Sequence, residues 1–323
     1  MQNYYENLQI VELTEAQTRQ YIDAESAWRA LQAAHAAARE VRGSMMWREQ
    51  AGRRYLVRVA ASGAQTSLGP ATPGNEQIYE RFTARKTSAE ARQRQLRDTV
   101  QQHVRMNRAL RVGRVPNLVV DTLQALADAG LQSHFLTVGT QALYAYETAC
   151  GVRVQTEATA TQDIDLLLDT RKYLSFVTTM QRLDTSLLGV FQKVDKTFAL
   201  RSDQRYTAVN ANGFEIDVVR REATGAAGGD PHPLRLSDHE EDFWAVQVAT
   251  GQRLLDGGRF TQTVVATSGR MATLQAPSPD SFVRIKRLLA DRPDRDPLKS
   301  RKDRLQADIV QHLLEDHGLR LQA

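Results

Sequence analysis

The stretch Asp163-Ile-Asp-Leu-Leu-Leu-Asp169 places acidic residues at alternate positions of an apolar run. A short apolar run bounded by polar residues is typical of a buried β-strand. Residues two apart in a strand point to the same face, so Asp163 and Asp165 project together. Ile164 and Leu166 then pack on the opposite face. Two carboxylates this close repel each other unless a cation lies between them. Structural ion pairs could satisfy them, but a divalent metal is the simpler expectation.

A second strand supplies a third carboxylate. In Phe214-Glu-Ile-Asp-Val-Val219, Asp217 lies in a similar apolar run and reaches the same acidic face if the two strands are neighbours. Three carboxylates suit two Mg²⁺ ions about 3.5–4 Å apart, one activating an attacking hydroxyl and one neutralising a leaving phosphate. Glu215 shares a face with Asp217, and it either assists metal binding or, more simply, faces solvent.

A strand-to-helix junction offers the complementary half of such a site. The apolar strand expected at 135–139 runs directly into a helix-prone stretch that begins at Thr140. Gly139 at the strand end lets a phosphate approach the backbone, and a helix N-terminus presents free N–H groups. The Thr140 hydroxyl adds a further donor to a phosphate oxygen.

Alternating strands and helices predict an α+β core with a mixed sheet at residues 115–276. A domain of helices and a β-hairpin (1–114) precedes this core, and a helical region (277–323) follows it. A flexible loop is expected at 225–233, a turn at Asn212-Gly213, and a strand-ending or helix-capping role for Asp169. Helices are expected at 14–41, 73–110, 117–130, 171–183, 280–290 and 299–317, and strands at 54–59, 65–68, 135–139, 163–169, 198–201, 206–210 and 214–219.

Basic residues are concentrated in two segments of the chain. Residues 42–114 hold 15 Lys and Arg against 5 Asp and Glu, and residues 284–304 hold 9 against 4. Arginine outnumbers lysine 35 to 7, and guanidinium groups suit phosphate oxygens. This distribution favours a polyanionic partner such as RNA. The alternative interpretation is that the first segment only solvates the outer face of its helices.

Composition excludes several classes of protein. The chain has 323 residues, of which 41% are hydrophobic and 25% charged, as in ordinary globular proteins. No apolar run is long enough for a membrane span. The first residues, Met1-Gln-Asn-Tyr-Tyr-Glu-Asn7, lack the basic and apolar regions of a secretory signal, and Cys150 is the single cysteine. We therefore expect a cytoplasmic protein without an intramolecular disulfide.

These motifs carry a resemblance to a known family. The segments 138–147, 160–167 and 214–219 together resemble the DNA polymerase beta-like nucleotidyltransferase superfamily. More narrowly, the whole chain resembles a bacterial group of nucleotidyltransferase-fold proteins whose substrate is unassigned. The motifs themselves cover about 80 residues, from Val138 to Val219. The implied fold is a mixed-sheet nucleotidyltransferase core.

The resemblance implies transfer of a nucleoside monophosphate from a nucleoside triphosphate, such as ATP, to an acceptor hydroxyl on RNA or protein. It implies a role for each matching residue. Gly139 and Thr140 would contact the triphosphate. Asp163 and Asp165 would hold two Mg²⁺ ions, and Asp217 would complete the ion nearest the acceptor. Basic residues after the sheet often contact the triphosphate in related enzymes, and the candidates are Lys286, Arg301 and Lys302.

Two features depart from the superfamily pattern. Gly139-Thr140 stands where Gly-Gly or Gly-Ser is usual, which retains a hydroxyl, and the 22 residues between Thr140 and Asp163 exceed the usual gap. The longer gap resembles the branch that includes nucleotidyltransferase toxins. The competing hypothesis is a non-catalytic protein that keeps the fold and binds nucleic acid or a partner. Intact Asp163, Asp165 and Asp217 favour the enzyme.

Overall fold

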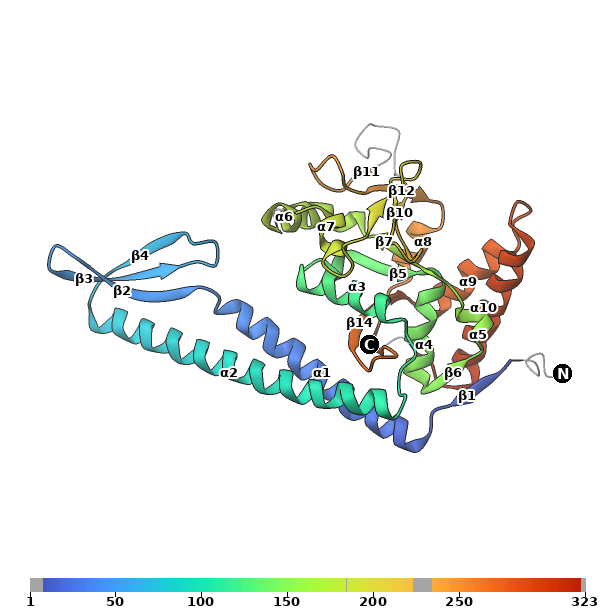
Figure 1. Cartoon of the computed structure of the whole chain (residues 1–323), viewed down its shortest axis with the longest axis horizontal. Helices are drawn as coiled ribbons and strands as arrows, with labels where there is room; N and C mark the ends of the chain where they lie inside the picture. Colours follow the sequence, from blue (N-terminus) through green and yellow to red (C-terminus); the bar gives the residue numbers. More distant parts are fainter. Residues whose placement is uncertain (1–7, 184, 223–233, 321–323) are drawn as a thin grey trace. The chain divides into compact units, whose positions relative to one another are not determined.

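The computed structural model describes residues 8–183, 185–222 and 234–320. Internal contacts divide the chain into two units (Figure 1). We call Arg19–Leu110 the hairpin unit, and the described residues on either side of it the sheet unit. The three-part division predicted at residues 114 and 276 stays a prediction about the sequence. The loop predicted at 225–233 and the segment Met1–Asn7 lie outside the described residues.

The hairpin unit consists of two antiparallel helices and a three-stranded sheet (Figure 1). Gln20 near the start of the first helix bonds Asn107 near the end of the second, which fixes their antiparallel arrangement. Thr72 caps the second helix by accepting a hydrogen bond from the N–H of Asn75. The elements are α1 (Glu15–Glu40), β2 (Ser44–Gln50), β3 (Arg53–Val59), β4 (Gln65–Pro70) and α2 (Pro73–Ala109).

The sheet unit contains the remaining elements. Its strands are β1 (Ile10–Glu12), β5 (Phe135–Val138), β6 (Val152–Val154), β7 (Asp163–Leu168), β8 (Ala199–Leu200), β9 (Thr207–Val209), β10 (Glu215–Arg221), β11 (Leu234–Arg235), β12 (Trp244–Val248), β13 (Arg259–Val265) and β14 (Met271–Pro277). Its helices are α3 (Asn117–Asp128), α4 (Leu143–Cys150), α5 (Thr156–Thr159), α6 (Tyr173–Leu183), α7 (Leu187–Gln192), α8 (Gly251–Asp256), α9 (Pro279–Ala290) and α10 (Pro297–Asp316), with 3₁₀ turns η1 (Gln132–His134), η2 (Gly139–Ala142) and η3 (Thr170–Lys172).

A mixed sheet lies at the centre of this unit, with strand order β11-β12-β10-β7-β5 and with β8 and β9 attached beside β10. β7 and β10 run parallel, as do β10 and β12, whereas β5 runs antiparallel to β7. The sequence-based expectation of an α+β fold with a mixed sheet is confirmed.

None of the helices in the described residues combines the length and apolar character that crossing a bilayer requires.

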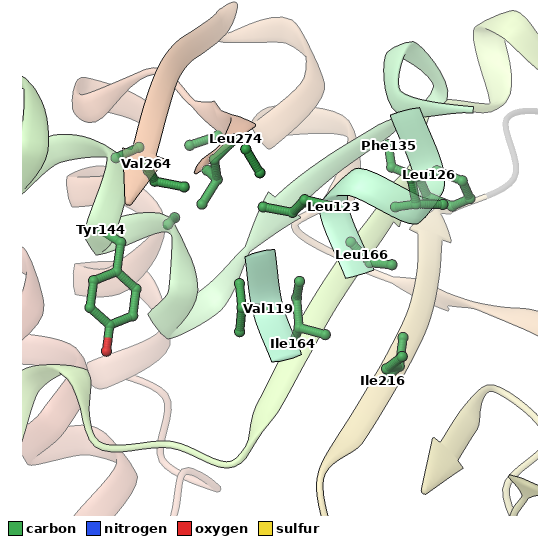
Figure 2. Close-up of a cluster of buried hydrophobic side chains, with 14 of the residues drawn as sticks. Val119, Leu123, Leu126, Phe135, Tyr144, Ile164, Leu166, Ile216, Val264 and Leu274 are labelled. Carbon is green, nitrogen blue, oxygen red and sulfur yellow. The ribbon is translucent and has the colours of Figure 1, made fainter. Parts of the chain in front are cut away.

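One face of the sheet forms the main core. Ile164 and Leu166 of β7 and Ile216 of β10 are fully buried there, packed with side chains of α3, α4 and the β13-β14 hairpin (Figure 2). Among the labelled side chains are Val119 and Leu123 from α3. Burial of apolar surface contributes about 25 cal/mol per Å², so this large cluster supplies most of the hydrophobic free energy that stabilises the unit.

The opposite face of the sheet is covered only in part. Leu167 of β7 and Leu136 of β5 pack there against Leu254 and Leu255 of α8 and Ile285 of α9. This second apolar cluster covers the C-terminal end of β7. The beginning of β7, where its aspartates lie, borders a pocket, so the uncovered part of this face is the acidic one.

Most elements lie where the sequence predicted them, including the helices at 117–130 and 280–290. The turn at Asn212-Gly213 is confirmed, because Gly213 has a φ of 78° between β9 and β10. Several helices and strands were not predicted from the sequence: β1, β2, β6, β11, β12, β13, β14, α5, α7 and α8. For β13, the missed signal is its enrichment in β-branched and aromatic residues, which are Phe260, Thr261, Thr263, Val264 and Val265.

Asp169 ends β7 and caps the turn after it, as predicted, and it also anchors β13. Its carboxylate accepts hydrogen bonds from Nε of Arg171 at 2.8 Å and from Nη2 of Arg259 at 2.9 Å. Burial by itself would raise the pKa of Asp169, but the hydrogen bonds and charges of the two guanidinium groups outweigh it and lower that pKa to about 2.

Replacing Asp169 with Asn should destabilise the sheet unit most strongly near neutral pH. A carboxyl whose pKa falls from 3.8 to about 2 on folding stabilises the native state by about 2 kcal/mol at pH 7. Because the folded pKa is the lower one, this contribution is complete above about pH 5 and falls to about half near pH 3. Denaturant unfolding of the parent and of Asp169→Asn at pH 7 and pH 3 measures it.

Asp238→Asn is the matched control, because Asp238 is an exposed carboxyl of the same unit. It should change the free energy of unfolding little at either pH. An Asp169→Asn deficit that is as large at pH 3 as at pH 7 would contradict the linkage.

Candidate functional site

The register between β7 and β10 sets the three predicted carboxylates side by side. Asp165 lies opposite Asp217, and Asp163 lies opposite Glu215. Because paired positions of neighbouring strands point to the same face, Asp163, Asp165 and Asp217 share the uncovered face of the sheet. The sequence predicted that Asp217 reaches this face only if the two strands are neighbours, and they are.

A pocket of about 660 Å³ opens in front of these carboxylates. Volumes between about 300 and 1,000 Å³ are usual for small-molecule sites. The pocket is walled by the β5–η2 junction, β7, β10, α9 and α10. Of the residues that the sequence singled out, seven line it: Gly139, Thr140, Asp163, Asp165, Asp217, Lys286 and Lys302. Arg301 is exposed and is not among the lining residues, so its triphosphate contact stays a prediction.

Burial and the neighbouring negative charges raise the pKa of two of these carboxyl groups, Asp165 and Asp217. Burial raises the pKa of Asp165 to about 7, with the charges of Asp163 and Asp217 adding to the shift. Burial also raises the pKa of Asp217, against a hydrogen bond from the hydroxyl of Thr207 at 2.5 Å. A positive group in front of these side chains would relieve the repulsion.

The donor chemistry of this cluster fits Mg²⁺, which prefers carboxylate oxygens and shares its remaining positions with water and phosphate. Within residues 8–183, 185–222 and 234–320, however, no three acidic, histidine or cysteine side chains are arranged as a finished ligand set. Asp163 accepts a hydrogen bond from the Thr161 hydroxyl, and Asp217 accepts one from Thr207. The cluster therefore has the right ligand type and charge, with two of its members held by hydroxyl groups.

Glu215 lies beside this cluster but outside the pocket. Its carboxylate forms an ion pair with Arg201 at 3.1 Å, and it is not among the residues lining the pocket. The simpler of the two sequence interpretations, a solvent-facing carboxylate, agrees with this arrangement, because the Glu215 side chain is 35% exposed.

Gly139 is required by geometry at the strand-to-helix junction. It has a φ of +65°, a region that side chains with a Cβ rarely adopt. A Cβ built on it would lie 2.2 Å from Oδ2 of Asp165. The bare backbone at this position is what leaves room for the Asp165 carboxylate at the pocket wall.

Two buried glutamines fix the start of the helix and of the acidic strand. Nε2 of Gln306 in α10 donates to the Thr140 hydroxyl at 3.1 Å, so that the hydroxyl keeps its own proton for another acceptor. Nε2 of Gln141 donates to the backbone carbonyl of Asp163 at 2.8 Å. Both bonds connect the junction to elements that carry the pocket.

Basic side chains of α9, α10 and the connection between them line the pocket on the side facing the carboxylates. We call Lys286, Arg295 and Lys302 the cationic wall. Lys286 donates to Oδ1 of buried Asp303 at 2.7 Å, and Arg295 donates to Oδ2 of the same residue at 2.7 and 2.9 Å. A single carboxylate thus orients two cations at the pocket. Lys302 bonds the carbonyl of Ala160, and burial together with the charge of Lys286 lowers its pKa.

Several pocket residues were not predicted from the sequence, and helical spacing is the signal for some of them. Positions three or four apart share one face of a helix. Starting from Lys302, that rule selects Lys299 and Gln306, both of which line the pocket, and it excludes Arg301. Asp303 and Arg295 were missed because their role depends on an ion pair that only the packing creates.

Substituting Ala at Gly139 should destabilise the sheet unit more than the same change at Gly213. Gly213 also has a positive φ, but a Cβ there has nothing within 4 Å. Gly213→Ala should therefore cost about 1–2 kcal/mol of backbone strain. Gly139→Ala carries that cost plus about 1–3 kcal/mol from the contact with Asp165.

Denaturant unfolding of the two variants measures the difference in the free energy of unfolding. Equal losses of stability would mean that Asp165 moves aside freely, contrary to a close contact that fixes the site.

Comparison with known proteins agrees with this geometry. A family model described as nucleotidyltransferase matches residues 117–322. That range contains the pocket and its acidic and basic walls. No curated protein and no solved structure matches the chain. The family match spans more than half of the sequence, and the chain therefore belongs to the nucleotidyltransferase family.

Proposed function

We propose that this protein transfers a nucleoside monophosphate from a nucleoside triphosphate to an acceptor hydroxyl, with two Mg²⁺ ions held by its aspartates. The observation that carries the proposal is the opposition of three carboxylates and a cationic wall across one pocket. Polyphosphate needs cations on both sides, and a pocket of this kind offers protein cations on one side and ligands for metal ions on the other.

The carboxylate side is proposed to hold the metal ions. Asp163 and Asp165 would contact both ions, and Asp217 would complete the ion nearest the acceptor. When bound, the two ions would promote ionisation of the attacking hydroxyl and neutralise the charge that develops on the leaving phosphate. The raised pKa of Asp165 supports this assignment, because its causes are burial and the charges of Asp163 and Asp217, and a bound cation would stabilise the ionised carboxylate against both.

The junction and the cationic wall are proposed to position the triphosphate. The backbone of Gly139 and the hydroxyl of Thr140 would contact phosphate oxygens. Lys286 and Lys302 would neutralise the terminal phosphates, with Lys286 oriented by Asp303. These groups are held in place before substrate binds, so little reorganisation is needed during the reaction.

The proposed reaction is an in-line displacement at the α-phosphorus. The acceptor oxygen forms a bond to phosphorus while the bond from phosphorus to the bridging oxygen of the β-phosphate breaks. Pyrophosphate leaves with that electron pair, and water takes up the hydroxyl proton. Such a reaction depends mainly on positioning and charge neutralisation, which the residues of this pocket can supply.

RNA is the favoured acceptor class and protein is the second. The preference for RNA rests on the excess of arginine in the chain, which suits a polyanion. The test is to incubate the protein with each labelled nucleoside triphosphate, Mg²⁺ and either total RNA or total protein. Label in RNA supports the favoured acceptor, label in protein supports the second, and label in neither contradicts nucleotidyl transfer.

Loss of a site carboxylate should strongly reduce label transfer, while loss of the neighbouring Glu215 should not. Asp163→Asn and Asp217→Asn each remove a proposed metal ligand, and the rate should fall by at least about 10²-fold. Glu215→Gln is the matched control, because it removes a carboxylate two residues from Asp217 that is paired with Arg201 outside the pocket lining. If the control loses as much activity as the site variants, the assignment of roles is wrong.

Truncation of the cationic wall should weaken nucleotide binding. Lys286→Met and Lys302→Met each remove one charge from the pocket, and each should raise the dissociation constant for the triphosphate by roughly tenfold, equivalent to about 1.4 kcal/mol. Isothermal titration with Mg²⁺ and a non-hydrolysable triphosphate measures this effect.

Arg301→Met tests the remaining candidate of the same sequence segment. A nucleotide confined to the pocket should bind this variant as tightly as it binds the parent, because Arg301 does not line the pocket. Weaker binding would mean that the triphosphate extends along α10 beyond the pocket.

A further inference from the structure

The second half of α2, in the hairpin unit, carries an unusual density of arginine. Residues 91–110 include five arginines and a single acidic residue, Asp98. All five arginines are exposed, and so is Asp98. The whole hairpin unit holds 16 Lys and Arg against 8 Asp and Glu, so half of its net charge lies on this stretch of 20 residues.

Four of the arginines lie on one side of the helix. At 100° per residue, Arg94, Arg97, Arg105 and Arg108 fall within an arc of about 80°. The buried residues Val100 and Asn107 lie on another side of α2, and Arg92 lies outside the arc. From Arg94 to Arg108 the helix rises about 21 Å. We call these four side chains the arginine stripe.

The arginine stripe differs from several other arginines of the same unit. Arg48 of the small sheet bonds Gln65, Arg54 lies over the ring of Trp47, and Arg58 lies over the ring of Phe82. These side chains stabilise the unit itself. Among the described residues, none accepts a hydrogen bond from, or forms an ion pair with, the guanidinium groups of the stripe. Four exposed guanidinium groups thus contribute charge to the surface and little to the fold.

We propose that the arginine stripe binds the phosphate backbone of double-helical RNA. Guanidinium groups pair well with phosphodiester oxygens, and a row of them along a rigid helix matches a polyanion rather than an isolated charge. The choice of RNA over DNA rests on the proposed function, in which RNA is the favoured acceptor. Binding would release counterions from the backbone, which makes the interaction strongly dependent on salt.

The aromatic residues of the hairpin unit favour a double helix over a single strand. Proteins that bind single strands stack bases on exposed aromatic rings. In Arg19–Leu110 no aromatic side chain is exposed, since Tyr21 and Trp28 are buried and the others are half-buried. Trp47 packs against Tyr79 with ring centroids 5.9 Å apart. A surface that offers charge without stacking suits paired bases, whose phosphates face outward.

The test measures binding and needs no catalysis. The full chain is titrated into a labelled 20-base-pair RNA duplex of arbitrary sequence, and fluorescence anisotropy is followed from 50 to 300 mM KCl. The variant Arg94→Gln, Arg97→Gln, Arg105→Gln, Arg108→Gln keeps helix-forming residues at every position. It should bind at least tenfold more weakly at 100 mM KCl, and the slope of log K against log salt should flatten by about 3 to 4.

Two control variants separate the stripe from net charge and from folding. Replacing the same four arginines with Lys keeps the charge and should retain most of the affinity. Changing Arg182, Arg287, Arg304 and Arg320 to Gln removes four exposed charges from the sheet unit outside the pocket and should leave the salt slope unchanged. Circular dichroism of every variant checks that the helix content is that of the parent.

Each outcome decides the proposal. Parent-like binding by the Gln variant of the stripe, or a loss as large in the sheet-unit control, overturns it. Tighter binding of a single-stranded RNA, or equal binding of a DNA duplex of the same sequence, overturns the choice of partner. Failure of the proposed function looks different: Asp163→Asn should bind the duplex as the parent does, so RNA binding without label transfer would reject the enzyme and keep the stripe.

Discussion

The parallel pairing of β7 with β10 is the constraint on which the site depends. Its register sets Asp217 opposite Asp165, so one ladder of backbone hydrogen bonds decides that three carboxylates share a face. The ladder is held by Ile164, Leu166 and Ile216, which are buried on the other face of the same strands. A shift by one residue would turn the apolar side chains toward the pocket and the aspartates toward the core. Packing and chemistry therefore specify the same register.

The charges around the pocket form a second level of constraint. Asp165 is half-buried beside two other carboxylates, an arrangement that costs stability, and its raised pKa reflects that cost. Asp303 acts in the opposite sense, because it neutralises and orients Lys286 and Arg295 on the facing wall. A structural ion pair on one side and uncompensated carboxylates on the other leave the pocket electrostatically incomplete. Perturbed pKa values of this kind are usual at functional sites.

Local sequence patterns predicted much of this molecule. Apolar alternation identified β7 and β10, and Gly139-Thr140 marked the junction, since its requirements for space and φ are local to the chain. Arg301 shows where such reasoning failed, because a count of basic residues does not say which side of α10 faces the pocket. Asp303 was invisible for a related reason: its importance comes from partners on α9 and on the connection between α9 and α10, and their approach is a result of packing.

By itself, the sequence determined the fold class, the three carboxylates and the junction, because each follows from periodicity and residue chemistry within a few positions. Tertiary structure alone decided that β7 and β10 are neighbours, that Glu215 is paired with Arg201, and which face of α10 lines the pocket. Those facts depend on side chains far apart in the chain. Their proximity is set by the burial of apolar surface over the whole unit, which no short segment encodes.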